Sequence, residues 1–537
     1  MPPTSSTRSR NVRYQSSVTT GATSPSVTAF SPGTRTVMSN RIRPSSAGVA
    51  STLPSNAVVV DLYLPGSTCS NVLSSLKARV TRSGSSVIPQ QRRGAGKNAS
   101  CSLISTPIFS RDCGVFLHSR LIRVVFMADV FRSTAALCDA LADATFDRPP
   151  ALVSNAHITG LGVARALTRA DVSVIALDRN GQGVAPPSNA VDYAGAVTYP
   201  LDDEASFRED VQRVVEAAGT EAVAFPCMDE WVHAYVRTEP DGVVCPFADR
   251  AGIDRVLDKT SLYDAAAELG VPHPETYQLS EVDPETAADR LGFPLVVKPA
   301  LKREFEEAVG TNVIEVSDRE EFAEVVATAA DHDVEIMAQK RVDVAAGRDH
   351  SLASYVPPSG TADALSVVGN ARVRHPRAYG TSCLVEQSEN PAIRERALSV
   401  LSEARYHGIS EAEFVYDTER EEFLLLDINT RSWKWIGMPV AAGVNLPVAA
   451  YASATDEQYD AEPVSQARWV YLRDYMARLA TDDEFRDRLA PQDWTAIAAD
   501  RAATRDLTTG VFSRADPAPT AKLLETEFSD REYYCSC

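Results

Sequence analysis

The stretch EFLLLDINTRSW, residues 422–433, begins as an apolar strand and ends in polar side chains. Side chains alternate between the two faces of a strand. One face is therefore expected to carry Leu425, Asp427, Asn429 and Arg431. The other face is expected to pack into the core and carries Leu424, Leu426, Ile428 and Thr430. A carboxylate, an amide oxygen and a fixed cation then lie in a row about 6 to 7 Å apart, which suits a metal ion that carries phosphates.

The preceding residues, 409–421, predict the partner strand of a hairpin. Pairing residues whose numbers sum to 840 places Glu413 opposite Asp427 on the same face. Two facing carboxylates repel each other without a cation, and Asn429 completes an all-oxygen set suited to Mg²⁺. The alternative is an exposed charged hairpin. It accounts for the glutamates at 421–422 but not for an acid that interrupts a run of Leu and Ile.

The charge is divided unevenly over the 537 residues, a length that predicts three or four domains. Residues 1–126 hold 15 Lys and Arg against two acids, a net charge of +13, and the remainder nets −32. This first segment is rich in Ser, Thr and Arg, and it lacks the apolar core of a signal peptide. We expect it to be disordered or a gene-start extension upstream of Met127. A basic tail is able to bind nucleic acid, but we expect no nucleic-acid partner because the larger part is acidic.

Lysine is rare from Met127 onward. The six lysines there are Lys259, Lys298, Lys302, Lys340, Lys434 and Lys522, and arginine supplies the other positive charges. An acid-rich, Lys-poor surface suits a protein dissolved in concentrated salt, where self-repulsion is screened. We therefore expect a halophilic, cytoplasmic protein. Each remaining lysine is informative, because such a composition keeps Lys where an ammonium group is needed.

Cysteine usage and hydropathy exclude several classes of protein. The nine cysteines contain no CxxC pair, so neither a disulfide framework nor a zinc site is indicated. No apolar run reaches about 18 residues, so we expect no membrane partner.

Residues 149–180 read as strand, Gly-containing turn, helix and strand, which is the opening of a βαβ unit. Gly160 and Gly162 start a dinucleotide fingerprint, but Arg165 stands near where the third glycine belongs. An NAD-dependent oxidoreductase is disfavoured for this reason. A later strand, residues 222–226, is followed by Asp229 and Glu230, which either line a ligand site at the strand end or cap the next helix.

Two lysines are placed at the ends of regular elements. Lys259 opens a helix that ends at Gly270, and Lys298 ends a buried strand. Both are candidates for binding the phosphates that a metal ion would bridge. The alternative for Lys259 is an exposed position at the helix N-terminus. A further strand carries Arg372 and Arg374 on one face.

Five stretches in this order resemble the ATP-grasp superfamily. They are VLDKTSLYDAAAELGVPHPET (256–276), GFPLVVKPA (292–300), IMAQKRV (336–342), AEFVYD (412–417) and LLLDINTRSW (424–433). The resemblance covers roughly residues 150–455 and is strongest to the carboxylate-amine ligase branch that includes D-aspartate ligase-like proteins.

The resemblance implies an α/β fold of the ATP-grasp type (α+β), with a Rossmann-like pre-ATP-grasp domain at 127–250. The ATP-grasp domain would follow at 251–455, with two lobes and a hinge near 336–345. Residues 456–537 would form a C-terminal acidic region that is partly helical.

The resemblance also implies roles for single residues. ATP phosphates would be bound by Lys259 and Lys298, and the adenine by Gln339, Lys340 and Val342. Mg²⁺ or Mn²⁺ would be held by Glu413, Asp427 and Asn429. The catalytic residues would be Arg431, which stabilises the charged transition state, and Lys298. Either Arg372 or Arg374 would reach a phosphate or the substrate carboxylate, and periodicity does not choose between them.

Three features depart from the family pattern. Asp427 stands where Glu is usual, and Lys340 stands where Glu is common in the adenine-binding strand. The loop at 299–310 lacks the usual glycines, and Lys302 and Arg303 are candidates for covering the phosphates there.

The activity implied is ATP-dependent joining of a small-molecule carboxylate to an amine through an acyl phosphate. The alternative is a regulatory protein that binds ATP without turnover, which the departures at Asp427 and Lys340 allow.

Overall fold

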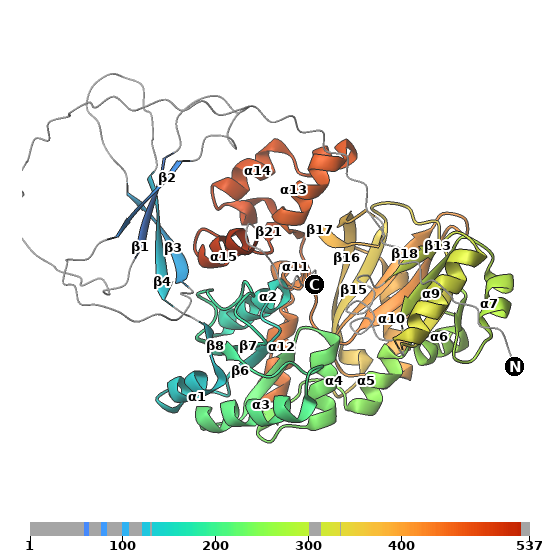
Figure 1. The fold of residues 1–537 in the computed structure, drawn as a ribbon, viewed down its shortest axis with the longest axis horizontal. Coiled ribbons are helices and arrows are strands. Elements are labelled where there is room, and N and C mark those ends of the chain that lie inside the picture. The colour runs from blue at the N-terminus through green and yellow to red at the C-terminus, as the bar shows by residue number, and fades with distance from the viewer. Residues whose placement is uncertain are drawn as a thin grey trace, which may run out of the picture. The chain divides into compact units, whose positions relative to one another are not determined.

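A parallel six-stranded sheet opens the well-described part of the chain (Figure 1). Its order is β10-β9-β6-β7-β8-β5. The strands are β5 (Phe131–Arg132), β6 (Ala151–Ser154), β7 (Val174–Asp178), β8 (Tyr193–Ala196), β9 (Ala222–Pro226) and β10 (Val243–Val244). The helices between them are α1 (Thr134–Ala142), α2 (Ile158–Leu167), α3 (Glu204–Ala218) and α4 (Asp229–Thr238). The predicted strand at 222–226 and the strand that ends at Asp178 are both confirmed.

The structure is a computed structural model that describes residues 131–299, 313–332, 334–377 and 379–527. Upstream it describes the backbone of four strands, β1 (Val58–Tyr63), β2 (Lys77–Arg82), β3 (Ala99–Thr106) and β4 (Leu121–Ala128), which pair in the order β2-β1-β4-β3. The sequence did not indicate these strands. The expectation that residues 1–126 are disordered or a gene-start extension concerns mainly residues outside the described part, and it stays a prediction.

The two glycines of the partial fingerprint lie inside helix α2, not in a turn before it, which corrects the sequence-based expectation. A Cβ on Gly160 would lie 2.8 Å from the Asn155 carbonyl oxygen, and one on Gly162 would lie 2.7 Å from Ile436. These glycines therefore allow close packing. The turn itself is closed by Asp178, whose Oδ2 accepts a hydrogen bond of 2.8 Å from the backbone N–H of Ala156.

A small antiparallel sheet follows, in the order β11-β14-β12-β13. Its strands are β11 (Thr276–Gln278), β12 (Leu295–Pro299), β13 (Ile314–Val316) and β14 (Ile336–Lys340), and its helices are α7 (Pro284–Leu291) and α9 (Arg319–Asp331). The faces alternate as a strand requires. Leu295, Val297 and Ala338 pack with the two helices, while Val296 and Lys298 face a cavity on the opposite side.

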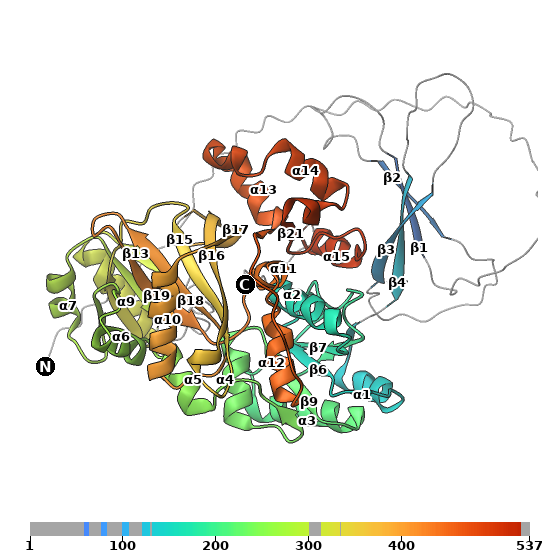
Figure 2. The same cartoon turned by 180° about the vertical axis from the view of Figure 1, so that it is seen from behind.

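The largest sheet has seven strands in the order β19-β18-β15-β16-β17-β20-β21. They are β15 (Asp349–Val356), β16 (Leu365–His375), β17 (Thr381–Ser388), β18 (Gly408–Asp417), β19 (Glu422–Asn429), β20 (Arg468–Val470) and β21 (Leu507–Thr509). The helices α5 (Arg250–Leu257), α6 (Lys259–Glu268) and α10 (Pro391–Glu403) precede or interrupt it, and α11 (Gly437–Ala441) and α12 (Leu446–Ala454) follow β19 (Figure 2).

The C-terminal region contributes strands as well as helices. Its helices are α13 (Leu472–Thr481), α14 (Pro491–Ala498) and α15 (Ala518–Glu527), which gather in one group in Figure 1. The short helices η3 (Asp483–Arg488) and η4 (Ala502–Arg505) lie between them in sequence. The sequence predicted only helical pieces here, whereas β20 and β21 extend the largest sheet. Two short strands of three residues each carry too little periodicity to be recognised.

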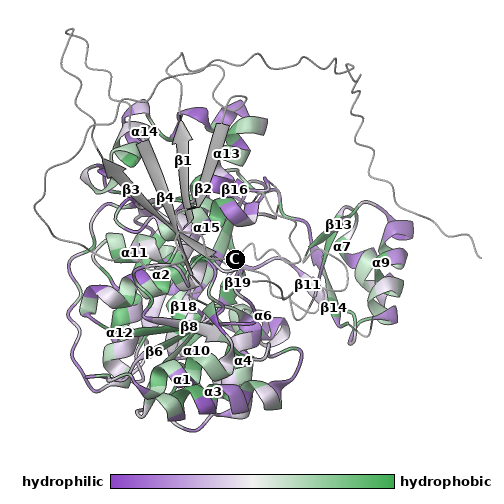
Figure 3. Cartoon of the chain, turned by 60° about the vertical axis from the view of Figure 1, so that its left-hand side comes forward, coloured by the Kyte–Doolittle hydropathy of each residue, from purple (hydrophilic) through white to green (hydrophobic). Residues whose placement is uncertain are grey.

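Burial follows the amphipathic pattern of the elements. In Figure 3, hydrophobic residues follow the strands, while the helices α3 and α9 show hydrophilic residues along their outer sides. Among the described helices, none combines the length and the apolar character that crossing a lipid bilayer requires.

The predicted hairpin forms, and its pairing is confirmed at the polar end. Glu413 pairs with Asp427 in the register whose numbers sum to 840. Beyond this pair the register shifts, because Phe414 pairs with Leu425 and leaves Leu426 as an extra residue. This β-bulge reverses the predicted faces of two leucines. Leu425 is fully buried in the core, and Leu426 lines the cavity beside the acid.

Candidate active site

A cavity of about 610 Å³ is lined by residues of the small sheet, the largest sheet and the helices α4 and α6. Eleven of the residues selected from the sequence line it. They are Lys259, Lys298, Gln339, Lys340, Val342, Arg372, Arg374, Glu413, Asp427, Asn429 and Arg431. Residues separated by up to 172 positions are thus brought to one place.

Four acidic or amide side chains gather where β18 and β19 pair. The Asn429 side-chain NH₂ donates to Glu411 Oε2 and to Glu413 Oε1, each over 3.2 Å. Glu411 Oε1 accepts a third hydrogen bond, of 2.8 Å, from Trp435 Nε1. Burial and the charge of Glu413 raise the pKa of Glu411 to about 8. The sequence analysis missed Glu411, although strand alternation places it on the face of Glu413.

The donor chemistry of this group fits the magnesium ion that the family resemblance implies. Within the residues that the structure describes, no cluster of three or more His, Cys, Asp or Glu side chains is arranged to hold a metal by itself. Glu413, Asp427 and Asn429 offer two carboxylates and one amide oxygen. Mg²⁺ is typically held in this way, through one or two carboxylates with water and substrate phosphates.

Lys259 is the first residue of α6 and forms an ion pair with Asp427. The side chain of Asp258 caps the helix by accepting a hydrogen bond of 2.8 Å from the N–H of Ser261. Lys259 is only 8% exposed, so the alternative of an exposed helix terminus is wrong. An ammonium buried at this point needs an anion beside it, and the hairpin supplies one.

The two candidate arginines of β16 have different neighbours. Arg374 donates to Asp349 Oδ2 over 2.8 Å and lies 3.5 Å from Glu413 Oε2. Burial raises the pKa of Asp349, and Arg374 opposes that shift. Arg372 lies instead 3.3 Å from Glu386. Arg374 therefore supports the acidic group, whereas Arg372 stands at a more open part of the cavity wall.

Arg431 is held by an acid from the parallel sheet. Its Nε lies 2.7 Å and its Nη2 3.4 Å from the two oxygens of Asp229. Asp229 and Glu230 form the first turn of α4 after an N-cap at Met228, and both line the cavity. The alternative that these acids cap the helix is therefore wrong, and both lie in the cavity wall.

The small sheet supplies the opposite wall. Gln339 donates to Tyr263 Oη over 3.0 Å and to Thr276 Oγ1 over 2.8 Å. The N–H of Lys340 donates to the Glu275 carbonyl oxygen. The apolar side chains of Val296, Met337 and Leu426 also line the cavity, so this part of the cavity combines apolar surface with backbone polar groups.

A contact joins the small sheet to the loop between β16 and β17 at the cavity wall. Tyr379 Oη donates to Glu315 Oε2 over 2.8 Å, and Arg341 Nε lies 2.9 Å from Glu315 Oε1. All three residues line the cavity. Lys302 and Arg303, expected over the phosphates, lie outside the described residues.

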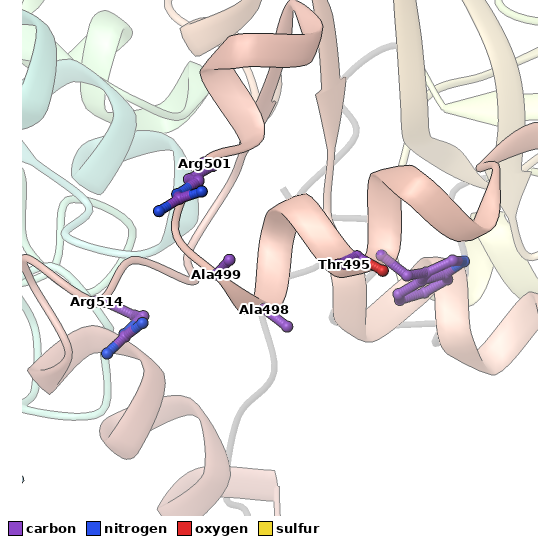
Figure 4. A pocket seen from close by; sticks show the side chains of 6 residues that line it. Thr495, Ala498, Ala499, Arg501 and Arg514 are labelled. Atoms are coloured by element: carbon purple, nitrogen blue, oxygen red, sulfur yellow. The ribbon is translucent and has the colours of Figure 1, made fainter. Parts of the chain in front are cut away.

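A second cavity, of about 640 Å³, lies in the C-terminal region (Figure 4). Its lining consists of Trp494, Thr495, Ala498, Ala499, Arg501 and Arg514. All of these except Trp494 are exposed. This surface hollow has no acid to hold a metal or to accept a proton, so the catalytic candidates remain in the first cavity.

Comparison with known proteins agrees with this geometry. No protein-family model matches the chain. A D-aspartate ligase of Enterococcus faecium is 23% identical over 219 residues, which cover 38% of this chain and 51% of that protein. A D-alanine–D-alanine ligase of Stutzerimonas stutzeri is 28% identical over 221 residues, which cover 38% of this chain and 62% of the relative. The chain is similar to ATP-grasp carboxylate-amine ligases.

The chain spans about half to three fifths of the length of these ATP-grasp relatives. Two solved structures are also similar. N5-carboxyaminoimidazole synthetase from Staphylococcus aureus shares 12% identity over 64% of this chain and 87% of its own, with a TM-score of 0.48. L-amino acid ligase from Bacillus licheniformis shares 15% identity over 60% of this chain and 80% of its own, with a TM-score of 0.44. At TM-scores below 0.5, neither likeness supports an inference about mechanism.

A further cavity residue, Lys434, was not assigned a role from the sequence. Lys434 lines the cavity three residues after Arg431 and is 6% exposed. The scarcity of lysine was the signal that would have identified it. Of the five lysines after Met127 that the structure describes, four line this cavity, namely Lys259, Lys298, Lys340 and Lys434.

Proposed function

We propose that this protein is an ATP- and Mg²⁺-dependent ligase that joins a carboxylate to an amine. The observation that supports this most strongly is the convergence of Lys259, Lys298, Arg431 and the Glu413–Asp427 pair on one cavity. The similarity to D-aspartate ligase and D-alanine–D-alanine ligase supports the same reaction class. Residues 127–250 would be the pre-ATP-grasp domain and residues 251–455 the ATP-grasp domain, with the hinge near 336–345.

The proposed roles follow from position. Lys259 and Lys298 would bind the phosphates of ATP, and Gln339, Lys340 and Val342 would border the adenine. Glu413, Asp427 and Asn429 would hold Mg²⁺, which when bound would neutralise charge on the phosphate oxygens. Lys259 and Asp427 are in contact, so a phosphate and a metal ion would meet at this point.

The reaction would take two steps. A substrate carboxylate attacks the γ-phosphate of ATP, which gives an acyl phosphate and ADP. An amine then attacks the acyl carbon, the C–O bond to phosphate breaks, and the amide forms with loss of a proton. Both steps develop negative charge on phosphoryl or carbonyl oxygens, and preorganised cations such as Arg431 and Lys298 stabilise that charge. No protein nucleophile is required.

The test is phosphate release from Mg-ATP by the full chain, in molar salt, with paired L- and D-amino acids and amines. We expect release that needs both a carboxylate and an amine. Asp427→Asn should lower the rate roughly 100-fold, as loss of one electrostatic group in an active site does. Glu422→Gln, at the other end of the same strand, is the matched control and should leave the rate unchanged.

Two results would contradict the proposal. If the wild-type chain does not bind Mg-ATP, measured by calorimetric titration, the nucleotide site is wrong. If it binds Mg-ATP but Asp427→Asn turns over as fast as the wild type, the assignment of the metal site is wrong.

A further inference from the structure

Lys434 lies deep in the cavity wall and is held by the C-terminal region. Its Nζ donates to Thr381 Oγ1 over 2.8 Å and to Asp474 Oδ2 over 2.5 Å. It also lies 4.7 Å from the centroid of the Tyr471 ring. Asp474, in helix α13, is 2% exposed. An ammonium has three N–H groups, of which these two oxygens engage two, so the third is left for the Tyr471 ring or for a ligand in the cavity that Lys434 lines.

The choice of lysine at this position is itself informative. Apart from the pair of Lys522 with Glu525 within one helix, the other ion pairs described in the C-terminal region use arginine, as in Arg468 with Asp493, Arg478 with Asp482 and Arg165 with Asp516. An ion pair that served only to attach the C-terminal region to the rest of the fold would be expected to use arginine as well. Lysine presents a compact point charge, whereas arginine presents a broad planar fork. The position therefore matches the other cavity lysines and not the structural arginines.

A second donor of the cavity wall, from the residue before Lys434 in the sequence, has no partner. Trp433 is 3% exposed and lines the cavity, and its Nε1 is buried with no hydrogen-bond acceptor. A buried donor without an acceptor destabilises the protein, because it has lost its hydrogen bond to water. A ligand oxygen that accepts from this N–H would remove that cost.

The surroundings of these donors are aromatic. The rings of Trp433 and Trp435 meet edge to face, with centroids 5.2 Å apart. Phe485, from η3 of the C-terminal region, also lines the cavity and is 4% exposed. A ligand at this place would meet two donors for an anion and an apolar wall.

We propose that Lys434 and the Trp433 N–H bind a carboxylate of the substrate, and that the substrate is an amino-acid-sized acid with an apolar side chain. The C-terminal region takes part in the site, because Asp474 positions Lys434 and Phe485 contacts the apolar side chain. This proposal rests on the proposed function and specifies the class of its substrate.

The experiment is calorimetric titration of the full chain, saturated with Mg²⁺ and a non-hydrolysable ATP analogue. The probes are the L- and D-forms of leucine, methionine and phenylalanine, and the carboxamide of each. The wild type should bind at least one acid tenfold or more tightly than its carboxamide. In Lys434→Met/Asp474→Leu, which removes both charges and leaves no unpaired buried ion, that preference should disappear.

The variant Arg165→Met/Asp516→Leu is the matched control. It removes another ion pair of the C-terminal region, partly buried and outside the cavity, and it should keep the preference for the acid. Trp433→Phe, which removes the N–H together with part of the indole ring, should weaken acid binding about fivefold. Thermal unfolding and nucleotide affinity show that each variant folds.

Three results would overturn the inference. One is a wild-type chain that binds no acid of the set more tightly than its carboxamide. Another is a Lys434→Met/Asp474→Leu variant that keeps the preference, which would make the pair a structural attachment. The third is a control variant that loses the preference equally. Failure of the proposed function would appear separately, as a wild-type chain that does not bind the nucleotide.

Discussion

Arg372 and Arg374 lie two positions apart in one strand, yet they have different neighbours and we expect them to have different roles. The guanidinium of Arg374 lies between Asp349 and Glu413, both largely buried. The side chain of Arg372 is 29% exposed and faces Glu386, which is 34% exposed. The sequence could not separate them, because periodicity reports the face of a strand and not the partners across it.

We expect opposite outcomes for the two methionine variants. Arg374→Met leaves two acids without their cation and should lower the free energy of unfolding by on the order of 3 kcal/mol. Arg372→Met should change it by less than about 1 kcal/mol, and should weaken nucleotide binding instead. Chemical denaturation and nucleotide titration measure the two quantities. Equal losses of stability would show that both arginines are structural.

The sequence identified most of the polar site because its signals are local. Asp427 interrupts an apolar run, and Lys298 ends one, so each is conspicuous in a short window. Glu411 is conspicuous only once its pairing with Asn429 is known. Lys434 depends on Asp474, which lies 40 residues later in a helix with no recognisable motif. Partners brought together by tertiary packing leave no pattern in either segment alone.

Among the strands, the bulge in β19 matters most for the site. Phe414 pairs with Leu425 and Glu413 pairs with Asp427, so Leu426 is an extra residue between the two pairs. Leu425 and Ile428 consequently both face the core, while Leu426 and Asp427 both face the cavity. The period of two along a strand does not predict a bulge. One extra residue moves every side chain on one side of the bulge to the opposite face of the sheet.

The adjacent leucines therefore provide a direct test of the bulge. Leu425→Ala should lower the free energy of unfolding by about 2 to 5 kcal/mol, as large-to-small changes in a core do, with little effect on nucleotide affinity. Leu426→Ala should do the reverse, because its side chain contributes apolar surface to the cavity. Denaturant unfolding with nucleotide titration distinguishes them. The regular strand predicted from sequence would give the opposite assignment.

Helix α14 is tied to the extended sheet by one acid. Asp493 accepts from Arg468 of β20 over 2.9 Å and 3.1 Å and from Arg505 of η4 over 2.5 Å. Its side chain is 2% exposed. These hydrogen bonds, that from Arg468 foremost, hold the pKa of Asp493 well below its usual range.

This lowered pKa fixes the direction of a pH effect. A carboxyl group whose pKa is lower in the folded state stabilises the fold above its unfolded value, about 3.9, and that contribution is lost as the pH falls. Asp493→Asn should cost on the order of 3 kcal/mol at pH 7, and the difference from wild type should shrink below about pH 4. Urea unfolding between pH 3 and 7 checks this. A difference that grows towards low pH would contradict it.

The chain as a whole carries a net charge of −19 at pH 7, and residues from Met127 onward carry −32. Charges of one sign on a folded surface repel each other and destabilise the compact state. Mobile ions screen this repulsion, since the Debye length falls from about 10 Å at 0.1 M to about 3 Å at 1 M salt.

We expect the temperature of thermal unfolding to rise when KCl is increased from 0.1 to 1 M, as followed by circular dichroism. Tetramethylammonium chloride at the same ionic strength is the control, because it screens charge without offering a small cation for specific sites. An unfolding temperature that stays constant or falls in both salts would show that surface repulsion is not a significant term.

The architecture was predictable where elements are long and strongly patterned. The strand at 222–226, the hairpin and helix α6 all follow from their own residues. The extension of the largest sheet by β20 and β21 did not, because each strand has three residues, and β17, with which β20 pairs, lies far back in the sequence. Short strands take their structure from the neighbours they join.

The contact of Tyr379 with Glu315 has a consequence for how ligands enter and leave the cavity. It links the small sheet to the loop between β16 and β17 by one hydrogen bond of 2.8 Å. A bond of this kind contributes about 1 kcal/mol, less than twice the thermal energy at 25 °C, so we expect it to break and re-form readily. We expect such a contact to affect the residence time of a ligand in the cavity more than its affinity.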